Sequence, residues 1–196
     1  MPLPTPDYPR TPLHNRTIRA QSFEREDGLW DIDAELIDTK AYDFTRRSGE
    51  VHEAGRAVHH MHVRITFNEA FEIVAAQVVY DAAPYGKQCS CIAAAYGDLV
   101  GMNLVKGFRR AVKERFGRVA GCTHVSELAG FLPTVAIQSR AGSRARKPVQ
   151  PAGRRPFQID GCHALSQHGP IVREFHPDWY VPLTEESKLT AKSDCS

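Results

Sequence analysis

The chain has 196 residues, 42% of them hydrophobic, and 25 basic against 23 acidic side chains give a net charge of +2. This length suits one domain with a real hydrophobic core, and the near balance of charge gives no global attraction to nucleic acid. No apolar run approaches the roughly 20 residues of a membrane helix, and the N-terminus lacks the apolar stretch of a secretory signal, so we expect no membrane association and a cytoplasmic location.

The N-terminal half is predicted to begin with a leader and a hairpin. Residues 1–13 are rich in proline and show no periodicity, which indicates a leader that is disordered or that orders on docking. The alternating segment that follows predicts an antiparallel hairpin turning at Asp27-Gly28, a strong hairpin dipeptide. Apolar residues of one parity form its buried face: Trp30, Ile32 and Leu36.

A second hairpin is the clearest pattern in the chain. We expect it over residues 58–67 paired with 71–80, because both segments are rich in β-branched residues and the first alternates strictly. Residues 39–57 are polar and charged and are expected to form a long loop between the two hairpins.

Beyond Pro84 the apolar spacing becomes helical. One helical segment is expected around Ile92, Tyr96 and Leu99, and a second, amphipathic helix around Phe108, Val112 and Phe116. The hairpins therefore come first and the helices second. This order predicts an α+β fold, with an antiparallel sheet of about four strands covered by helices on one face, as a single domain over residues 14–138.

A third helix is expected to begin near Thr123. Glu127 resembles the carboxylate of a capping box at this helix start, although it can also face a site. Pro133 bends the helix or marks a break in it.

The C-terminal part has mixed character. Residues 139–156 are basic and rich in Gly, Pro and Ser, which predicts a flexible linker, with contact to an acidic partner as the alternative. Residues 157–183 are expected to regain order, to include a short strand at 171–175, and to pack back on the domain. Residues 184–196 are expected to be a disordered tail.

Three groups of side chains offer the thiolate, imidazole and carboxylate ligands that zinc and related metals prefer. These groups are the histidines His59, His60 and His62, the thiols Cys89 and Cys91, and the set Cys122, His124 and Glu127. The total of five cysteines is odd, which argues against a disulfide framework and leaves thiols for the core, for metal or for chemistry.

Strand pleating separates the three histidines. His60 and His62 share the face that points away from the apolar residues, where a solvated histidine is the commoner outcome. His59 shares the core face at the end of the strand where the sheet opens onto loops. It is therefore either a site residue or a histidine bonded to the backbone.

Two thiols stand near predicted helix starts. Cys89 follows the second hairpin and Cys122 directly precedes the third helix, and a helix N-terminus lowers the pKa of a thiol. The two thiols can converge at one edge of the sheet. The alternative is that each is a small buried hydrophobic side chain.

Several segments resemble a known family. The stretches "REDGLWDIDAELIDTKAYDF", "DAAP", "GCTHVSEL" and "CHALSQHGPIVREFHPDWY" resemble the bacterial family catalogued as domain of unknown function 2889. This resemblance covers nearly the whole chain. It implies no particular activity, since no reaction is assigned to that family.

A second resemblance concerns layout. Residues 59–131 are similar in arrangement to the NifU-like iron–sulfur cluster assembly scaffold proteins. That resemblance implies that Cys89 is the cysteine after the hairpin, that Cys122 is the cysteine opening a helix, and that His59 falls near the aspartate that assists the ligands. Ala57 stands where the first scaffold cysteine would fall, so Cys162 is the candidate for the missing thiol.

These observations support three hypotheses. The first is a protein that binds zinc or an iron–sulfur cluster, with ligands drawn from His59, Cys89, Cys122, His124 and Cys162. The second is a metal-free enzyme acting on a small carbonyl or thioester substrate, with Cys122 or Cys89 as nucleophile or His59 as base. The third is an accessory module without chemistry that binds a protein partner. Whether the protein is an enzyme stays open at this point.

Overall fold

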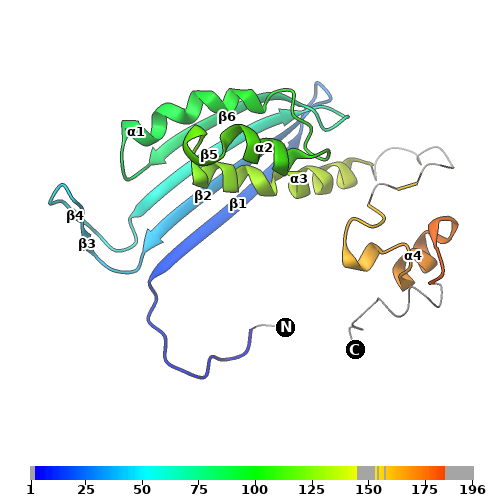
Figure 1. Cartoon of the computed structure of the whole chain (residues 1–196), viewed down its shortest axis with the longest axis horizontal. Helices are drawn as coiled ribbons and strands as arrows, with labels where there is room; N and C mark the ends of the chain where they lie inside the picture. Colours follow the sequence, from blue (N-terminus) through cyan, green and yellow to red (C-terminus); the bar gives the residue numbers. More distant parts are fainter. Residues whose placement is uncertain (1–2, 145–152, 154, 157, 184–196) are drawn as a thin grey trace. The chain divides into compact units, whose positions relative to one another are not determined.

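Four antiparallel strands form one sheet in the order β1-β2-β5-β6 (Figure 1). The computed structural model describes residues 3–144, 153, 155–156 and 158–183, and the chain divides into two compact units, Met1–Lys147 and Pro148–Ser196. The strands of the sheet are β1 (His14–Glu24), β2 (Trp30–Lys40), β5 (Ala57–Phe67) and β6 (Ile73–Ala82). The predicted α+β class with a four-stranded antiparallel sheet is confirmed.

The first hairpin turns where the sequence predicts. Glu24 pairs with Trp30, and Gly28 takes a φ of 83°, a conformation that glycine adopts without steric cost. The Asp27 carboxylate accepts a hydrogen bond from the backbone N–H of Leu29 at 3.3 Å. The described part of the leader, residues 3–13, is exposed and contains no strand or helix.

The second hairpin joins β5 to β6 and is also confirmed. At its turn the Asn68 side chain accepts hydrogen bonds from the backbone N–H groups of Ala70 (2.9 Å) and Glu72 (3.1 Å). The segment before it is not a plain loop as expected, because it contains two short paired strands, β3 (Phe44–Thr45) and β4 (Val51–His52). His52 is buried, and it supports this small hairpin by bonding Arg46.

Helices lie over one face of the sheet, as predicted (Figure 1). These elements are α1 (Lys87–Ser90), the 3₁₀ helix η1 (Cys91–Leu99), α2 (Phe108–Phe116), the 3₁₀ helix η2 (Arg118–Ala120) and α3 (Thr123–Arg144). We call this the covered face and the opposite one the open face. Within the described part of the chain, no helix is both long enough and apolar enough to cross a membrane.

The core lies between the covered face and the helices. Alternate residues of β2 and β5 are buried there, and Leu128 and Leu132 of α3 are fully buried against them. Each fully buried Leu or Phe side chain stabilises the fold by roughly 2–3 kcal/mol. The buried strand residues are Trp30, Ile32, Ala34 and Leu36 of β2 and Met61, Val63, Ile65 and Phe67 of β5.

The first expected helix is a 3₁₀ helix rather than an α-helix. In η1, Tyr96 and Leu99 are fully buried and stand three residues apart. A 3₁₀ helix has three residues per turn and places such a pair in line on one side. Apolar spacing alone does not separate the two helix types.

Helix α3 begins at Thr123, as expected, and runs further than expected. Glu127 Oε2 accepts a hydrogen bond from Arg16 Nη1 at 2.5 Å, and the capping role of Glu127 stays a prediction. Pro133 lies inside the helix without ending it. Residues 139–144 continue the helix although the sequence suggested a linker, and Arg140 and Ser143 are buried within the first unit. The rest of the predicted linker lies mostly outside the described residues.

In the described residues of the second unit, the regular elements are short helices. They are η3 (His163–Leu165), α4 (Pro170–Phe175) and η4 (Pro177–Trp179). The strand expected at residues 171–175 is wrong, because Pro170 occupies the first turn of a helix, where its fixed φ fits and its missing N–H has no intrahelical partner to lose. Packing of residues 157–183 on the first unit stays a prediction, and residues 184–196 lie outside the described ones.

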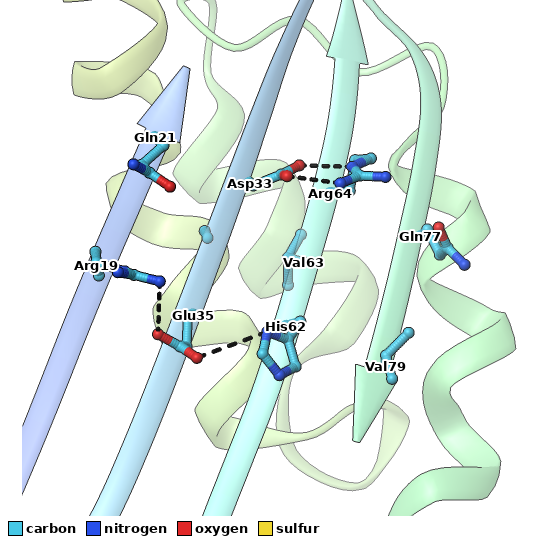
Figure 2. Close-up of a pocket in the computed structure, with 10 residues that line it drawn as sticks. Arg19, Gln21, Asp33, Glu35, His62, Val63, Arg64, Gln77 and Val79 are labelled. Atoms are coloured by element: carbon cyan, nitrogen blue, oxygen red, sulfur yellow. Dashed lines mark hydrogen bonds and ion pairs between the residues drawn. The ribbon is translucent and has the colours of Figure 1, made fainter. Parts of the chain in front are cut away.

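The open face of the sheet is polar and charged. Figure 2 shows Asp33 bonded twice to Arg64 and Glu35 between Arg19 and His62. These side chains line a shallow pocket of about 370 Å³. The polar positions alternate along each strand with the buried ones, which is the expected pattern for a sheet covered on one side.

Candidate functional site

On each of the two central strands, β2 and β5, the row of buried apolar residues ends in a polar side chain. On β2 the buried row that starts at Trp30 continues through Leu36 to Asp38, which is only 3% exposed. On β5 the row from Phe67 continues through Met61 to His59, which is half-buried. Since β2 pairs with β5 and Asp38 lies opposite His59 in that register, the carboxylate and the imidazole are neighbours on the covered face.

Asp38 is bound tightly by the edge strand. Arg16, its register partner on β1, donates from Nε to Oδ1 at 2.7 Å and from Nη2 to Oδ2 at 2.8 Å. His14 Nε2 lies 3.0 Å from Oδ1. Burial opposes ionisation of this carboxyl, but the hydrogen bonds and charge of Arg16 outweigh it and lower the pKa of Asp38 to about 2.

Two imidazoles lie beside Asp38 Oδ2, the oxygen that also accepts the hydrogen bond from Arg16 Nη2. His59 Nδ1 lies 3.1 Å from Asp38 Oδ2, and His124 Nε2 lies 3.6 Å from the same oxygen. The two rings stack with centroids 3.8 Å apart. Burial, followed by the nearby His124, lowers the pKa of His59, which favours its neutral form at neutral pH.

Cys122 is held at the start of α3. The Tyr96 hydroxyl accepts a hydrogen bond from the Cys122 backbone N–H at 2.8 Å and donates one to the Cys122 carbonyl at 2.9 Å. The thiol sulfur lies 3.9 Å from His124 Nδ1. Burial opposes ionisation of the thiol. Hydrogen bonds from His124, from Tyr80 and from the backbone N–H groups of Val125 and His124 nevertheless lower the pKa of Cys122 to about 7.

Tyr80 of β6 also reaches this thiol. The Tyr80 hydroxyl is buried, and apart from its approach to the Cys122 thiol it has no hydrogen-bond partner among the described residues. Burial first, and the hydrogen bond with the Cys122 thiol after it, raise the pKa of Tyr80. Cys89 lies in α1 and is half-buried. Tyr80 also lines a polar pocket of about 460 Å³, together with Arg46 and Arg56.

Donor atoms suited to a metal ion gather at two places among the described residues. One is Asp38, His59 and His124, and the other is Glu35, His60 and His62 on the open face. Within each group one donor atom per residue lies within 4.8 Å of the others. We call the set Asp38, His59, Cys122 and His124 the covered-face cluster.

The structure brings together three of the five metal ligands expected from the sequence. His59, Cys122 and His124 belong to the covered-face cluster, while Cys89 lies in α1 and outside both donor groups. Cys162 is exposed and lies in the second unit. Among the candidates weighed as ligands from the sequence, His60 and His62 point away from the core as predicted.

Asp38 and Arg16 were missed by sequence reasoning. A signal for Asp38 was present, because it shares the parity of Trp30, Ile32 and Leu36 and so continues the buried row. A carboxylate on the core face of a strand is costly without a partner, and this cost points to a basic residue on the neighbouring strand. Nothing in the local pattern identified Arg16 as that partner.

Comparison with family models places the chain in a known family. A family model described as a protein of unknown function, DUF2889, matches residues 14–138. The matched span contains the whole covered-face cluster and ends before Cys162. Comparison with curated proteins and comparison with solved structures each found no match.

Proposed function

We propose that this chain, which belongs to the DUF2889 family, binds a zinc ion through Asp38, His59 and His124 on the covered face of its sheet. The observation that carries the proposal is the convergence of these donors from β2, β5 and α3 on one point. Zinc bonds of about 2.0–2.1 Å in a tetrahedral site place neighbouring donor atoms about 3.4 Å apart. The two imidazole nitrogens lie 3.1 and 3.6 Å from Asp38 Oδ2.

Neighbouring groups suit the ligands to this role. Arg16 fixes the orientation of the Asp38 carboxylate, as outer hydrogen-bond partners do for metal-bound carboxylates. His124 Nδ1 faces the Cys122 sulfur. When Nδ1–H donates a hydrogen bond to the thiolate, the other nitrogen, Nε2, carries the lone pair that a metal requires.

The donor types favour a single zinc ion over an iron–sulfur cluster. Such clusters are held chiefly by cysteine thiolates, and neither donor group in the described part of the chain contains a cysteine. Three protein ligands leave a fourth position open, the arrangement of catalytic rather than structural zinc sites. Cys122 lies next to that site through its contact with His124.

The test is zinc binding by a double variant. Replacement of both His59 and His124 by alanine removes two of three ligands and is expected to weaken tight zinc binding by at least about 100-fold. Isothermal titration of zinc into chelator-treated protein measures this loss. His163, an exposed histidine of the second unit, supplies the control variant His163→Ala, which should bind as the wild type does. A folded double variant that keeps wild-type zinc affinity at this site contradicts the proposal.

A second candidate function is nucleophilic catalysis by Cys122. The order Cys122 Sγ, His124 Nδ1, His124 Nε2 and Asp38 Oδ2, with separations of 3.9 Å and 3.6 Å, matches that of a nucleophile, a base and an orienting carboxylate. The thiolate would attack the carbonyl of a thioester to form an acyl-enzyme, and protonated His124 would give its proton to the departing thiolate. Water would then release the acid.

The thiol itself supplies a pH prediction. In a chelator-treated variant whose other four cysteines are serine, alkylation of Cys122 by iodoacetamide is expected to reach half its maximal rate at about pH 7. The thiolate is the reactive form and is present above that pH. Tyr80→Phe removes one hydrogen bond to the thiolate, so its midpoint should move to higher pH. A midpoint near 8.5 in the variant that keeps Tyr80, the value of a free thiol, would remove the support for this second function.

A further inference from the structure

The open face of the sheet carries a second group of histidines and carboxylates. His60 and His62 lie two residues apart on β5, so their side chains project from the same face. Glu35 of β2 is the register partner of His62, and Asp81 lies on β6 at the other side. We call these four residues the open-face cluster.

In the open-face cluster, Glu35 and Asp81 approach opposite nitrogens of the two imidazole rings. Glu35 Oε1 lies 2.9 Å from His60 Nε2 and 4.0 Å from His62 Nδ1. Asp81 Oδ2 lies near the opposite nitrogens, 2.8 Å from His62 Nε2 and 3.8 Å from His60 Nδ1. Each ring therefore has one nitrogen beside Glu35 and its other nitrogen toward Asp81.

From this arrangement we infer that the open-face cluster is a second zinc site, with Glu35, His60 and His62 as ligands and Asp81 as their positioning residue. A carboxylate that accepts a hydrogen bond from one ring N–H of a histidine fixes the tautomer in which the other ring nitrogen is free to bind a metal. Asp81 is placed to do this for His62. Glu35, His60 and His62 each offer one donor atom, and these atoms lie within 4.8 Å of one another.

The surroundings leave the site open to solvent. The side chains of Glu35 and His60 are 21% and 24% exposed, and the described helices of the first unit all lie on the opposite face. In Figure 2, Glu35 and His62 lie at one end of the shallow pocket, with Arg19 3.5 Å from Glu35 on its other oxygen. A zinc ion held here by three ligands has its remaining coordination positions toward solvent, which predicts weaker binding than at the buried Asp38 site.

This site is independent of the proposed function. The two sets of ligands occupy opposite faces of the same strands, and successive residues of β5, His59 and His60, belong to different sets. Loss of one set therefore leaves the donor atoms of the other in place.

Zinc titration of two double variants tests the inference. Wild-type protein is expected to bind two zinc ions, His60→Ala/His62→Ala only the tighter one, and His59→Ala/His124→Ala only the weaker one. Asp81→Asn should weaken the open-face ion by about 10- to 100-fold without changing the other. Gln21→Ala/Gln77→Ala on the same face is the control and should bind as the wild type does.

The outcomes separate the two proposals. A His60→Ala/His62→Ala protein that keeps two ions, or a wild type whose only ion is lost with His59 and His124, overturns the open-face site. A wild type that binds one ion, lost with His60 and His62 alone, supports the open-face site and contradicts the function proposed for Asp38. X-ray absorption of zinc on the His59→Ala/His124→Ala protein should show two imidazole ligands, and a spectrum without imidazole indicates an adventitious ion only.

Discussion

Replacement of Asp38 by asparagine is expected to lower the free energy of unfolding of the zinc-free protein by about 3 kcal/mol at neutral pH, because it leaves the Arg16 guanidinium without its buried counter-charge. The lowering of the Asp38 pKa from 3.8 to about 2 corresponds by itself to about 2.5 kcal/mol. Urea denaturation in the presence of a chelator measures the difference between the two proteins.

The pH dependence gives this prediction a second readout. The folded-state pKa of Asp38 lies below its unfolded value, so the stabilisation is fully present above about pH 4 and is lost as the pH falls toward 2. The gap between wild type and Asp38→Asn should therefore narrow over that range. Asp33→Asn is the matched control. Asp33 pairs with Arg64 on the open face, where both side chains are exposed, so its loss should cost less than about 1 kcal/mol. Equal losses for the two variants would contradict the role given to burial.

Replacement of Gly121 by alanine is expected to destabilise the fold by about 3 kcal/mol and to displace Cys122. A Cβ at this position would lie 2.9 Å from the Tyr96 hydroxyl and 2.8 Å from Phe116 Cβ, and closer still to the Phe116 carbonyl oxygen. Tyr96 is fully buried and bonds the Cys122 backbone in both directions, so it cannot withdraw without losing those bonds. Thermal denaturation should show a lower melting temperature.

The same variant tests how the thiol is activated. Because the start of α3 must shift, the backbone and side-chain hydrogen bonds to Cys122 should weaken and its alkylation midpoint should rise above about pH 7. Gly130→Ala in the same helix is the control, since a Cβ there meets no atom within 4 Å and alanine is favoured over glycine inside a helix. A Gly121→Ala protein with wild-type stability and an unchanged midpoint would show that this glycine does not position the thiol.

The two sets of donors follow from one feature of β5. The segment His59, His60, Met61 and His62 alternates between faces, so one run of sequence contributes to a buried cluster and to an exposed one. Pleating predicted this separation correctly. It did not predict that the exposed histidines would meet Glu35 and Asp81, which led to their interpretation as solvated side chains.

The errors along the chain share a cause. The segment around Ile171 alternates weakly and was predicted as a strand, but Pro170 starts a helix there. Residues 139–144 have the composition of a linker, yet Arg140 is buried with its guanidinium over the Trp30 ring, 4.4 Å from its centroid. The proline constrains the backbone in the first case, and a tertiary contact stabilises the helix in the second. A pattern of hydrophobic residues indicates neither effect.

Local sequence by itself determined the two hairpins of the main sheet, their turns and the face on which the side chains of β2 and β5 lie. The period-two pattern of β2 and β5 and the Asp27-Gly28 turn are properties of neighbouring residues, so they can be deduced without knowledge of the fold. Tertiary structure alone decided that Asp38 meets Arg16, His59 and His124, which come from three other elements of the chain. That meeting depends on strand register and on where α3 begins over the sheet, and both are set by packing across the whole core rather than by any short segment.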